Sequence, residues 1–100
     1  MSYSQLRAFD AVARGGSFSR AAQMLGVTQP AVSLQVAGLE RAYRTDLIRR
    51  KGSGISLTDE GKALFALTRQ MFALEAEIED FLSASLKLQR GHLRFAADGP

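Results

Sequence analysis

The longest continuous pattern in the sequence is helical and runs from Thr58 to about Leu88. A polar residue at Thr58 followed by Asp59 and Glu60 is typical of a helix N-terminus, where side chains accept unpaired N–H groups and anions are favoured. Apolar residues then recur at alternating spacings of three and four, which is the heptad register of a coiled-coil seam. These seam residues are Leu64, Leu67, Met71, Leu74, Ile78 and Phe81. At 1.5 Å per residue the helix measures roughly 45 Å, more than one small domain can cover, so we expect it to pair with a second chain.

Two shorter helices are predicted at the start of the chain. The first begins at Ser2, in a capping-box pattern, and ends at Gly15 and Gly16. The second is capped by Ser17 and ends at Gly26, because glycine takes the left-handed conformation of a helix end at low steric cost.

A third helix begins at Thr28, whose hydroxyl can accept a backbone N–H of the first turn. Pro30 falls within that turn, where its missing N–H leaves no helical hydrogen bond unmade. Apolar residues then recur at spacings of four, three and four, which gathers them on one stripe that we expect to be buried. They are Val32, Val36, Leu39 and Tyr43. The opposite side of the helix carries Ser33, Leu34, Ala37 and Arg41.

A short helix, a glycine turn and a longer helix with a polar outer face form a helix-turn-helix. Two short strands are predicted next, DLIRR at 46–50 and GISL at 54–57, with a basic, glycine-rich wing tip at 51–54. The predicted fold class is therefore mainly α: a winged helix-turn-helix with a two-stranded wing and a long C-terminal dimerisation helix. We assign residues 1–57 to the winged domain and 58–89 to the linker and dimerisation helix. Alternating character at 93–95 predicts a strand, so we expect residues 90–100 to begin a further, truncated domain.

Charge is distributed unevenly over the two parts of the chain. Residues 1–57 carry eight Lys or Arg against three acidic residues, a net charge of +5, whereas residues 58–100 carry five against seven, a net charge of −2. A basic first half favours contact with a polyanion. Ordinary solvated surface charge is the alternative at this point.

Several classes of protein are disfavoured by the composition. The chain has no cysteine and a single histidine, His92, so we predict no catalytic residue, no metal site and no cofactor. No stretch approaches the roughly 20 apolar residues of a membrane span, and the N-terminus lacks the pattern of a secretory signal. We expect a soluble, cytoplasmic chain with no membrane partner.

The stretch SFSRAAQMLGVTQPAVSLQVAGLE at 17–40, followed by DLIRR and GISLTDEG, resembles the N-terminal DNA-binding domain of LysR-type bacterial transcriptional regulators. The resemblance implies binding to double-stranded DNA, at two half-sites, by a homodimer joined antiparallel through the long helix, and an association with the nucleoid. It also implies that a small-molecule effector binds the absent effector-binding domain, and that tetramers form only with that domain.

The resemblance further implies a set of DNA-binding residues. Thr28 corresponds to a phosphate contact, and Ser17 and Ser19 lie near the DNA backbone. The residues that enter the major groove are Gln29, Pro30, Ser33 and Leu34. Arg50 corresponds to the wing arginine at the end of the first strand, and Lys51 is close enough to substitute for an arginine at Ser53. The full predicted set is Ser17, Ser19, Thr28, Gln29, Pro30, Ser33, Leu34, Arg50, Lys51 and Ser53. The chain departs from the family pattern at Leu34 and Ser53, where members often carry basic residues, and at Arg44, where they usually carry glycine.

The residues predicted to meet base edges favour a site with A·T pairs. Gln29 can pair with adenine N6 and N7, and Pro30 and Leu34 offer apolar contact to a thymine methyl group. For Leu34, packing against the wing or a neighbouring chain is the alternative. Two other interpretations of the whole chain stay open: another winged-helix family, such as the molybdate-responsive regulators, and a helical dimerisation module that does not bind DNA.

Overall fold

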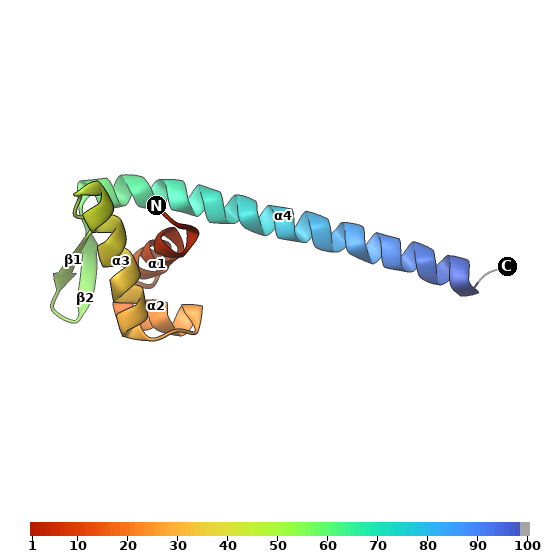
Figure 1. Cartoon of the computed structure of the whole chain (residues 1–100), viewed down its shortest axis with the longest axis horizontal. Helices are drawn as coiled ribbons and strands as arrows, with labels where there is room; N and C mark the ends of the chain where they lie inside the picture. The colour runs from red at the N-terminus through yellow and green to blue at the C-terminus, as the bar shows by residue number, and fades with distance from the viewer. Residues whose placement is uncertain (99–100) are drawn as a thin grey trace. The chain divides into compact units, whose positions relative to one another are not determined.

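The structure is a computed structural model that describes the backbone of residues 1–98 and the side chains of residues 1–88. It contains helices α1, α2 and α3, a hairpin of strands β1 and β2, and helix α4 (Figure 1). The bounds are Tyr3–Gly15 for α1, Phe18–Leu25 for α2, Gln29–Tyr43 for α3, Ile48–Lys51 for β1, Gly54–Leu57 for β2 and Asp59–Asp98 for α4. The chain divides into two compact units, of which the first is Met1–Arg69 and the second begins at Gln70. The predicted mainly α fold with a two-stranded wing is confirmed.

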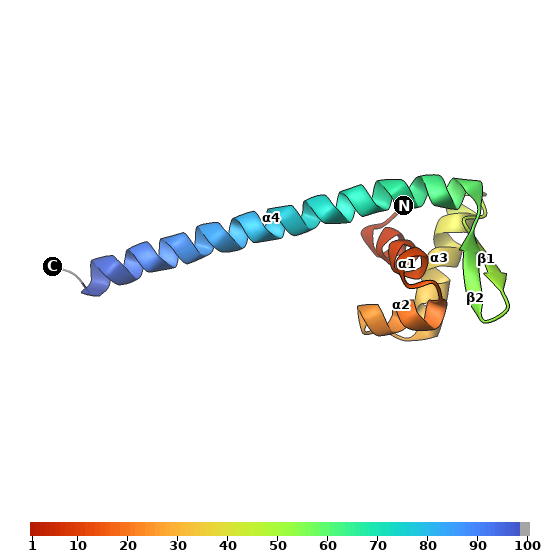
Figure 2. The same cartoon turned by 180° about the vertical axis from the view of Figure 1, so that it is seen from behind.

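Side-chain caps fix where the first two helices begin. Ser2 Oγ accepts a hydrogen bond from Gln5 N, and Gln5 Oε1 accepts one from Ser2 N, both at 3.1 Å, which is the predicted capping box. Ser17 Oγ accepts from Arg20 N at 3.0 Å at the start of α2. Glycines with positive φ end both helices, at Gly16 and Gly26, and the tight turns that result bring α2 and α3 together against α1 (Figure 2).

Helix α3 begins as predicted and ends in an unusual way. Thr28 Oγ1 accepts from Ala31 N at 3.3 Å, and Pro30 lies within the first turn. At the other end, Arg44 takes the left-handed conformation with φ 51° and ψ 46°, and Thr45 N donates to Glu40 O at 3.0 Å. A left-handed arginine is uncommon because its Cβ crowds the backbone. The turn that follows α3 is therefore made by a strained arginine.

The core of the first unit lies among α1, α2 and α3. Its buried apolar residues are Leu6, Ala8, Phe9, Ala11, Val12, Phe18, Ala21, Ala22, Val32, Val36, Leu39 and Leu47. The predicted stripe of α3 is buried at three of its four positions. Tyr43 is the exception, because it is the last residue of α3 and lies at the rim of an apolar pocket, where 57% of its surface stays exposed.

Strand β2 lies at its predicted position, whereas β1 begins two residues later and ends one residue later than predicted. Strands β1 and β2 pair antiparallel with Ile48 opposite Leu57 and Lys51 opposite Gly54, so only residues 52–53 form the turn. Strand β1 starts two residues late because the preceding chain is held by Glu40. The Glu40 Oε2 atom accepts from Leu47 N at 2.7 Å and from Ile48 N at 3.2 Å.

Thr58 joins the hairpin to α4. Its backbone N donates to Leu47 O at 3.0 Å, and its hydroxyl donates to Asp46 O at 2.6 Å. The same oxygen accepts from Gly61 N at 3.0 Å, as the predicted cap requires. Gly61 has no room for a side chain, because a Cβ there would overlap Leu47 O and lie 3.0 Å from Leu47 C. The Thr58 and Gly61 pair therefore lets α4 start directly against the chain that precedes β1.

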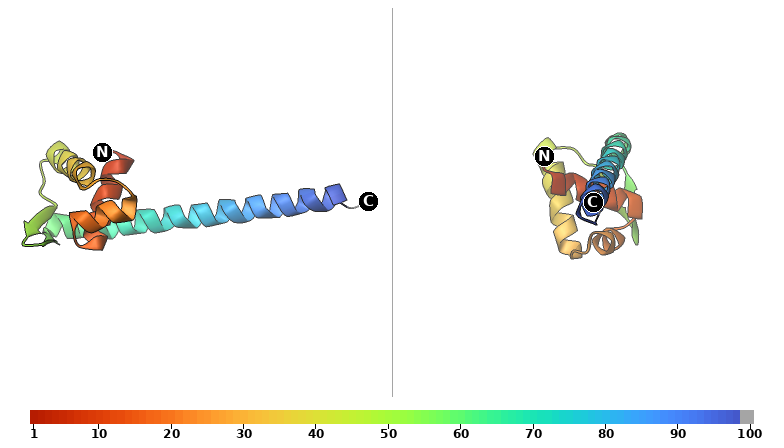
Figure 3. Two further views of the ribbon diagram at one scale, coloured as in Figure 1. Left: turned by 90° about the horizontal axis from the view of Figure 1, so that it is seen from below. Right: turned by 90° about the vertical axis from the view of Figure 1, so that its right-hand side faces the viewer.

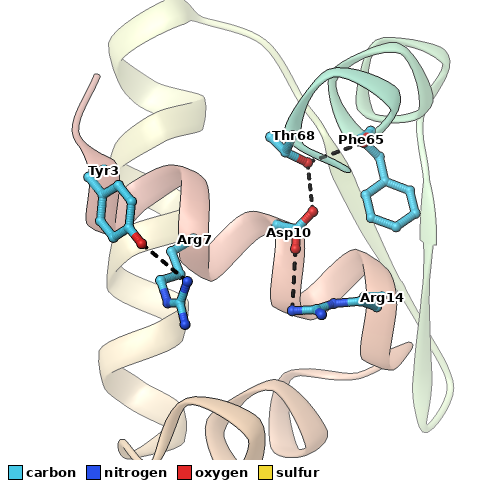
Figure 4. A network of polar contacts seen from close by, with 6 residues as sticks. All are labelled: Tyr3, Arg7, Asp10, Arg14, Phe65 and Thr68. Atoms are coloured by element: carbon cyan, nitrogen blue, oxygen red, sulfur yellow. Dashed lines mark hydrogen bonds and ion pairs between the residues drawn. The ribbon is translucent and has the colours of Figure 1, made fainter. Parts of the chain in front are cut away.

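A buried polar contact joins the first turns of α4 to α1 within the first unit. The Thr68 hydroxyl donates to Asp10 Oδ1 at 2.8 Å, and only 2% and 3% of these residues are exposed (Figure 4). The other carboxylate oxygen of Asp10 forms an ion pair with Arg14 Nη2 at 3.4 Å. The stretch of α4 up to Arg69 thus belongs to the same folded unit as α1, α2, α3 and the hairpin (Figure 3).

Beyond Gln70, α4 continues as a helix with exposed apolar side chains. Those at Met71, Leu74, Ile78, Phe81, Leu82, Leu86 and Leu88 are all exposed. The helix extends to Asp98, so the strand predicted at 93–95 is wrong: the helix continues past Leu88, where the sequence predicted its end. Side chains after Leu88, including His92, lie outside the described part, and the assignment of 90–100 to a further domain stays a prediction. No helix among the described residues is long and apolar enough to cross a membrane.

Candidate nucleic-acid interface

The first two turns of α3 form an exposed edge of the first unit. Val32 and Val36 face the core, which places the residues between them on the outside. Thr28, Gln29 and Pro30 are all exposed. The predicted recognition surface is therefore accessible along its length.

Leu34, one of the two predicted base-reading apolar residues, has 74% of its surface accessible. A leucine packed against the wing would be largely covered, so the wing-packing alternative is excluded within this chain. An isolated exposed leucine is common on protein surfaces. Its position at the centre of an exposed polar helix face gives Leu34 a place where a thymine methyl group could cover it.

A hydrogen bond between two predicted site residues orients Gln29. The Ser19 hydroxyl, in the first turn of α2, donates to Gln29 Oε1 at 3.2 Å. The amide oxygen is thus held by α2, and the amide nitrogen remains as a donor for a base edge. Ser19 therefore fixes the orientation of the Gln29 amide.

Arg50 joins the wing to both helices of the helix-turn-helix. Its guanidinium carbon lies 4.0 Å from the centre of the Phe18 ring, and its Nη2 donates to Ser33 Oγ at 3.2 Å. A guanidinium stacked on an aromatic face is favoured electrostatically and keeps its remaining N–H groups in a fixed plane. The sequence predicted Arg50 and Ser33 but missed Phe18, which reads as an ordinary core residue because nothing in the chain order pairs it with the wing.

A polar pocket of about 200 Å³ lies between the start of α2, the start of α3 and the wing, and Arg50 and Phe18 are among the residues that line it. Its lining includes the predicted site residues Ser17, Ser19, Gln29, Arg50 and Ser53. Three hydroxyl groups and a guanidinium around one hollow are donors of the kind that bind phosphate oxygens. Four other predicted residues, Thr28, Pro30, Leu34 and Lys51, lie outside this pocket, and Ser33 reaches it only through Arg50.

Basic side chains are exposed on the first unit, while two of its acidic side chains are engaged in contacts within the fold. The predicted contact Arg50 and its neighbours Arg49 and Lys51 are exposed, as are Arg20 and Arg41. Two of the three acids before Thr58 are engaged, since Glu40 holds the backbone ahead of β1 and Asp10 holds Thr68 and Arg14. No group of three His, Cys, Asp or Glu side chains suited to a metal ion occurs among the described residues.

Comparison with known proteins decides the family. A family model of the bacterial regulatory helix-turn-helix proteins of lysR type matches residues 3–62. The chain belongs to the LysR family. That excludes the molybdate-responsive and other winged-helix families as alternatives.

Similar proteins place the chain within this family. It is 41% identical over 96 residues to the RuBisCO operon transcriptional regulator of Allochromatium vinosum, which covers 96% of this chain and 32% of that protein. A crystal structure of a CbnR_DBD–DNA complex superimposes with a TM-score of 0.72 at 34% identity, over 86% of this chain and 99% of that one. A complex of BenM_DBD with benA site 1 DNA gives 0.69 at 27%, over 88% and 99%. The chain spans about a third of the length of the curated relatives it matches.

Proposed function

We propose that this LysR-family chain is the DNA-binding part of a transcriptional regulator, which binds double-stranded DNA sequence-specifically as a homodimer. The observation that carries the proposal is the exposed start of α3 beside the docked wing arginine. Gln29 and Leu34 face outward, and Arg50 is fixed next to them by Phe18 and Ser33. Two relatives of similar structure, CbnR_DBD and BenM_DBD, have crystal structures in complex with DNA.

In this proposal α3 enters the major groove, which has the width of an α-helix. Gln29 pairs with adenine: its amide nitrogen donates to N7, and its oxygen, which has two lone pairs, accepts from N6 as well as from Ser19. Pro30 and Leu34 contact thymine methyl groups, so the preferred half-site contains A·T pairs under the first two turns of α3. Ser33 accepts the hydrogen bond from Arg50 of the wing and also enters the major groove beside Leu34.

Phosphate groups are bound on both sides of α3. Thr28 contacts one phosphate at the helix start, where backbone N–H groups also favour an anion. The polar pocket receives another through Ser17, Ser19 and Arg50, and the wing tip adds Lys51 and Ser53. These contacts set the register of the protein on the duplex, and α3 supplies the sequence preference.

The dimer is formed by the seam residues of α4. Each dimer then carries two copies of α3, which suits an operator with two half-sites. Effector binding and tetramer formation belong to the portion of such regulators beyond this chain, and the location of the whole protein on the bacterial nucleoid follows from its DNA binding.

The first test measures binding to genomic DNA fragments as a function of salt. The logarithm of the association constant should fall by about 0.9 for each phosphate contact per tenfold rise in salt. Weak, salt-independent retardation would contradict phosphate binding. Complete absence of retardation at low salt, from a protein that sediments as a dimer, would favour a helical dimerisation module instead.

The second test assigns sequence preference to Leu34. Binding sites are selected from random DNA with the unmodified chain, with Leu34→Arg and with Gln35→Arg, which adds the same charge at the next exposed position. We expect Leu34→Arg to exchange an A·T pair for a G·C pair at one position, because arginine pairs with guanine O6 and N7. Gln35→Arg should tighten binding without changing the selected sequence. If all three proteins select one sequence, Leu34 does not read a base.

A further inference from the structure

An apolar pocket of about 300 Å³ lies in the first unit, away from the predicted DNA-binding residues. Its walls come from α1, the end of α3, the chain before β1 and the first turns of α4. They are formed by Met1, Leu6, Leu39, Tyr43, Thr45, Leu47 and Leu64. Leu64 is also the first residue of the predicted dimer seam, so the pocket and the seam share this residue.

The seam has a symmetry that restricts how two copies pair. Its six residues are placed symmetrically about the midpoint between residues 72 and 73. If two α4 helices run antiparallel about that point, Met71 faces Leu74, Leu67 faces Ile78 and Leu64 faces Phe81 of the partner. Every seam residue then meets another seam residue, in the alternation of a and d positions that antiparallel heptads require.

We propose that Phe81 of one chain inserts into this pocket on its partner. The inference rests on the proposed homodimer and specifies where one copy touches the other. Phe81 is 69% exposed in the single chain, and burial of a phenylalanine is among the largest apolar gains that a side chain offers. A cavity of roughly 150 Å³ already accommodates benzene, so the pocket is large enough for the ring.

The proposed contact ties the far part of one α4 to the winged helix-turn-helix of the other chain. In a dimer held by the seam alone, only the first turns of α4 would attach each winged helix-turn-helix to the partner. With Phe81 inserted between α1 and the end of α3, each unit has a fixed place in the dimer. The distance between the two copies of α3 is then set by the insertion of Phe81 into the pocket as well as by the pairing of the α4 helices.

Chemical cross-linking tests the pairing, and the chain has no native cysteine to interfere. The variants Leu64→Cys and Phe81→Cys are each purified alone and also co-expressed, then treated with a short bismaleimide. In the proposed dimer, equivalent positions lie 17 residues apart along the helices, about 25 Å, so neither variant alone should be cross-linked. The co-expressed pair should give a covalent dimer.

The alternative arrangements give other patterns. A parallel dimer would cross-link each single variant and overturn the proposal. A protein that sediments as a dimer without any cross-link between positions 64 and 81 would also overturn it, while leaving the proposed DNA-binding homodimer intact. A monomer at all concentrations would overturn both, and binding to a single half-site, measured separately, would show whether DNA recognition survives.

Removal of the ring tests its insertion. Phe81→Ala should weaken dimer association by about 100-fold or more, because each dimer contains two copies and each buried aromatic contact is worth about tenfold or more. Leu86→Ala, at a side chain that is 47% exposed and off the seam, should change association by less than about threefold. Tyr43→Ala at the pocket rim should weaken association less in the Phe81→Ala background than alone. Additive effects of the two substitutions would overturn the insertion.

Discussion

Thr68→Val tests whether the contact between α1 and α4 stabilises the first unit. Valine keeps the shape of threonine and removes only the hydroxyl, which donates to Asp10 Oδ1 at 2.8 Å. Both residues are buried, and Arg14 reaches only the other oxygen of the carboxylate. The substitution therefore leaves one oxygen of a buried acid without a donor.

The expected cost follows from that orphaned oxygen. A hydrogen bond to a charged group contributes about 1.5–3 kcal/mol, and an unsatisfied buried partner adds to the loss. We therefore expect Thr68→Val to lower the free energy of unfolding by about 2–3 kcal/mol. Thr68→Ser keeps the hydroxyl and loses one methyl group, which costs about 0.8 kcal/mol. The larger and more apolar replacement is thus predicted to be the worse one.

Urea unfolding followed by circular dichroism measures both variants, at one protein concentration because dimerisation contributes to apparent stability. The two substitutions should also be compared in an Asp10→Ala background, where Thr68→Val no longer orphans a carboxylate. Its cost should fall by more than about 1 kcal/mol there. If Thr68→Val costs no more than Thr68→Ser, or costs the same in both backgrounds, the buried contact does not stabilise the fold.

Three further substitutions give distinct outcomes. Gly61→Ala should lower the free energy of unfolding by about 1–3 kcal/mol, because the new methyl group overlaps Leu47 O. Lys62→Ala, exposed in the same turn, should leave it unchanged, and equal costs would refute the steric account. Arg44→Gly should raise the free energy of unfolding by about 1 kcal/mol by relieving the left-handed arginine, whereas Arg44→Ala should not, and a gain from alanine as large as that from glycine would contradict this. Arg50→Lys should weaken DNA affinity about tenfold in a titration followed by fluorescence anisotropy, since lysine keeps the charge and loses the stacking on Phe18 and the hydrogen bond to Ser33. Arg49→Lys is the control, and an equal loss there would show that the stacking is irrelevant.

The local elements were predictable because their signals are local. The caps at Ser2, Ser17 and Thr28 each act within three residues, and the structure has all three. The glycine turns and the hairpin follow from the same short-range chemistry. The heptad spacing of α4 likewise depends only on helical geometry. Five of its six seam residues are exposed in the single chain, and Leu64 is half-buried.

The remaining features depend on contacts between distant residues. Asp10 and Thr68 are 58 residues apart, and neither has a local signal that marks it as buried. The position of Arg50 over Phe18 required the hairpin to fold back on α2. Tyr43 was assigned to the core by periodicity, which does not tell where a neighbouring element stops. The strand predicted at 93–95 was wrong because alternation over three residues is too short to distinguish a strand from a helix.

The hydrogen bond between Ser33 and Arg50 has a consequence for how such a protein could change its target. Ser33 lies on α3 one residue before Leu34, and it also anchors the wing. A mutation at Ser33 that suited a new base would remove the hydrogen bond that holds Arg50. In the proposed complex it would therefore also weaken the contact of Arg50 with the DNA backbone. Selection for a new operator would then favour substitutions at Leu34 before substitutions at Ser33, because Leu34 does not anchor the wing. Substitutions at the two positions together should show strong epistasis.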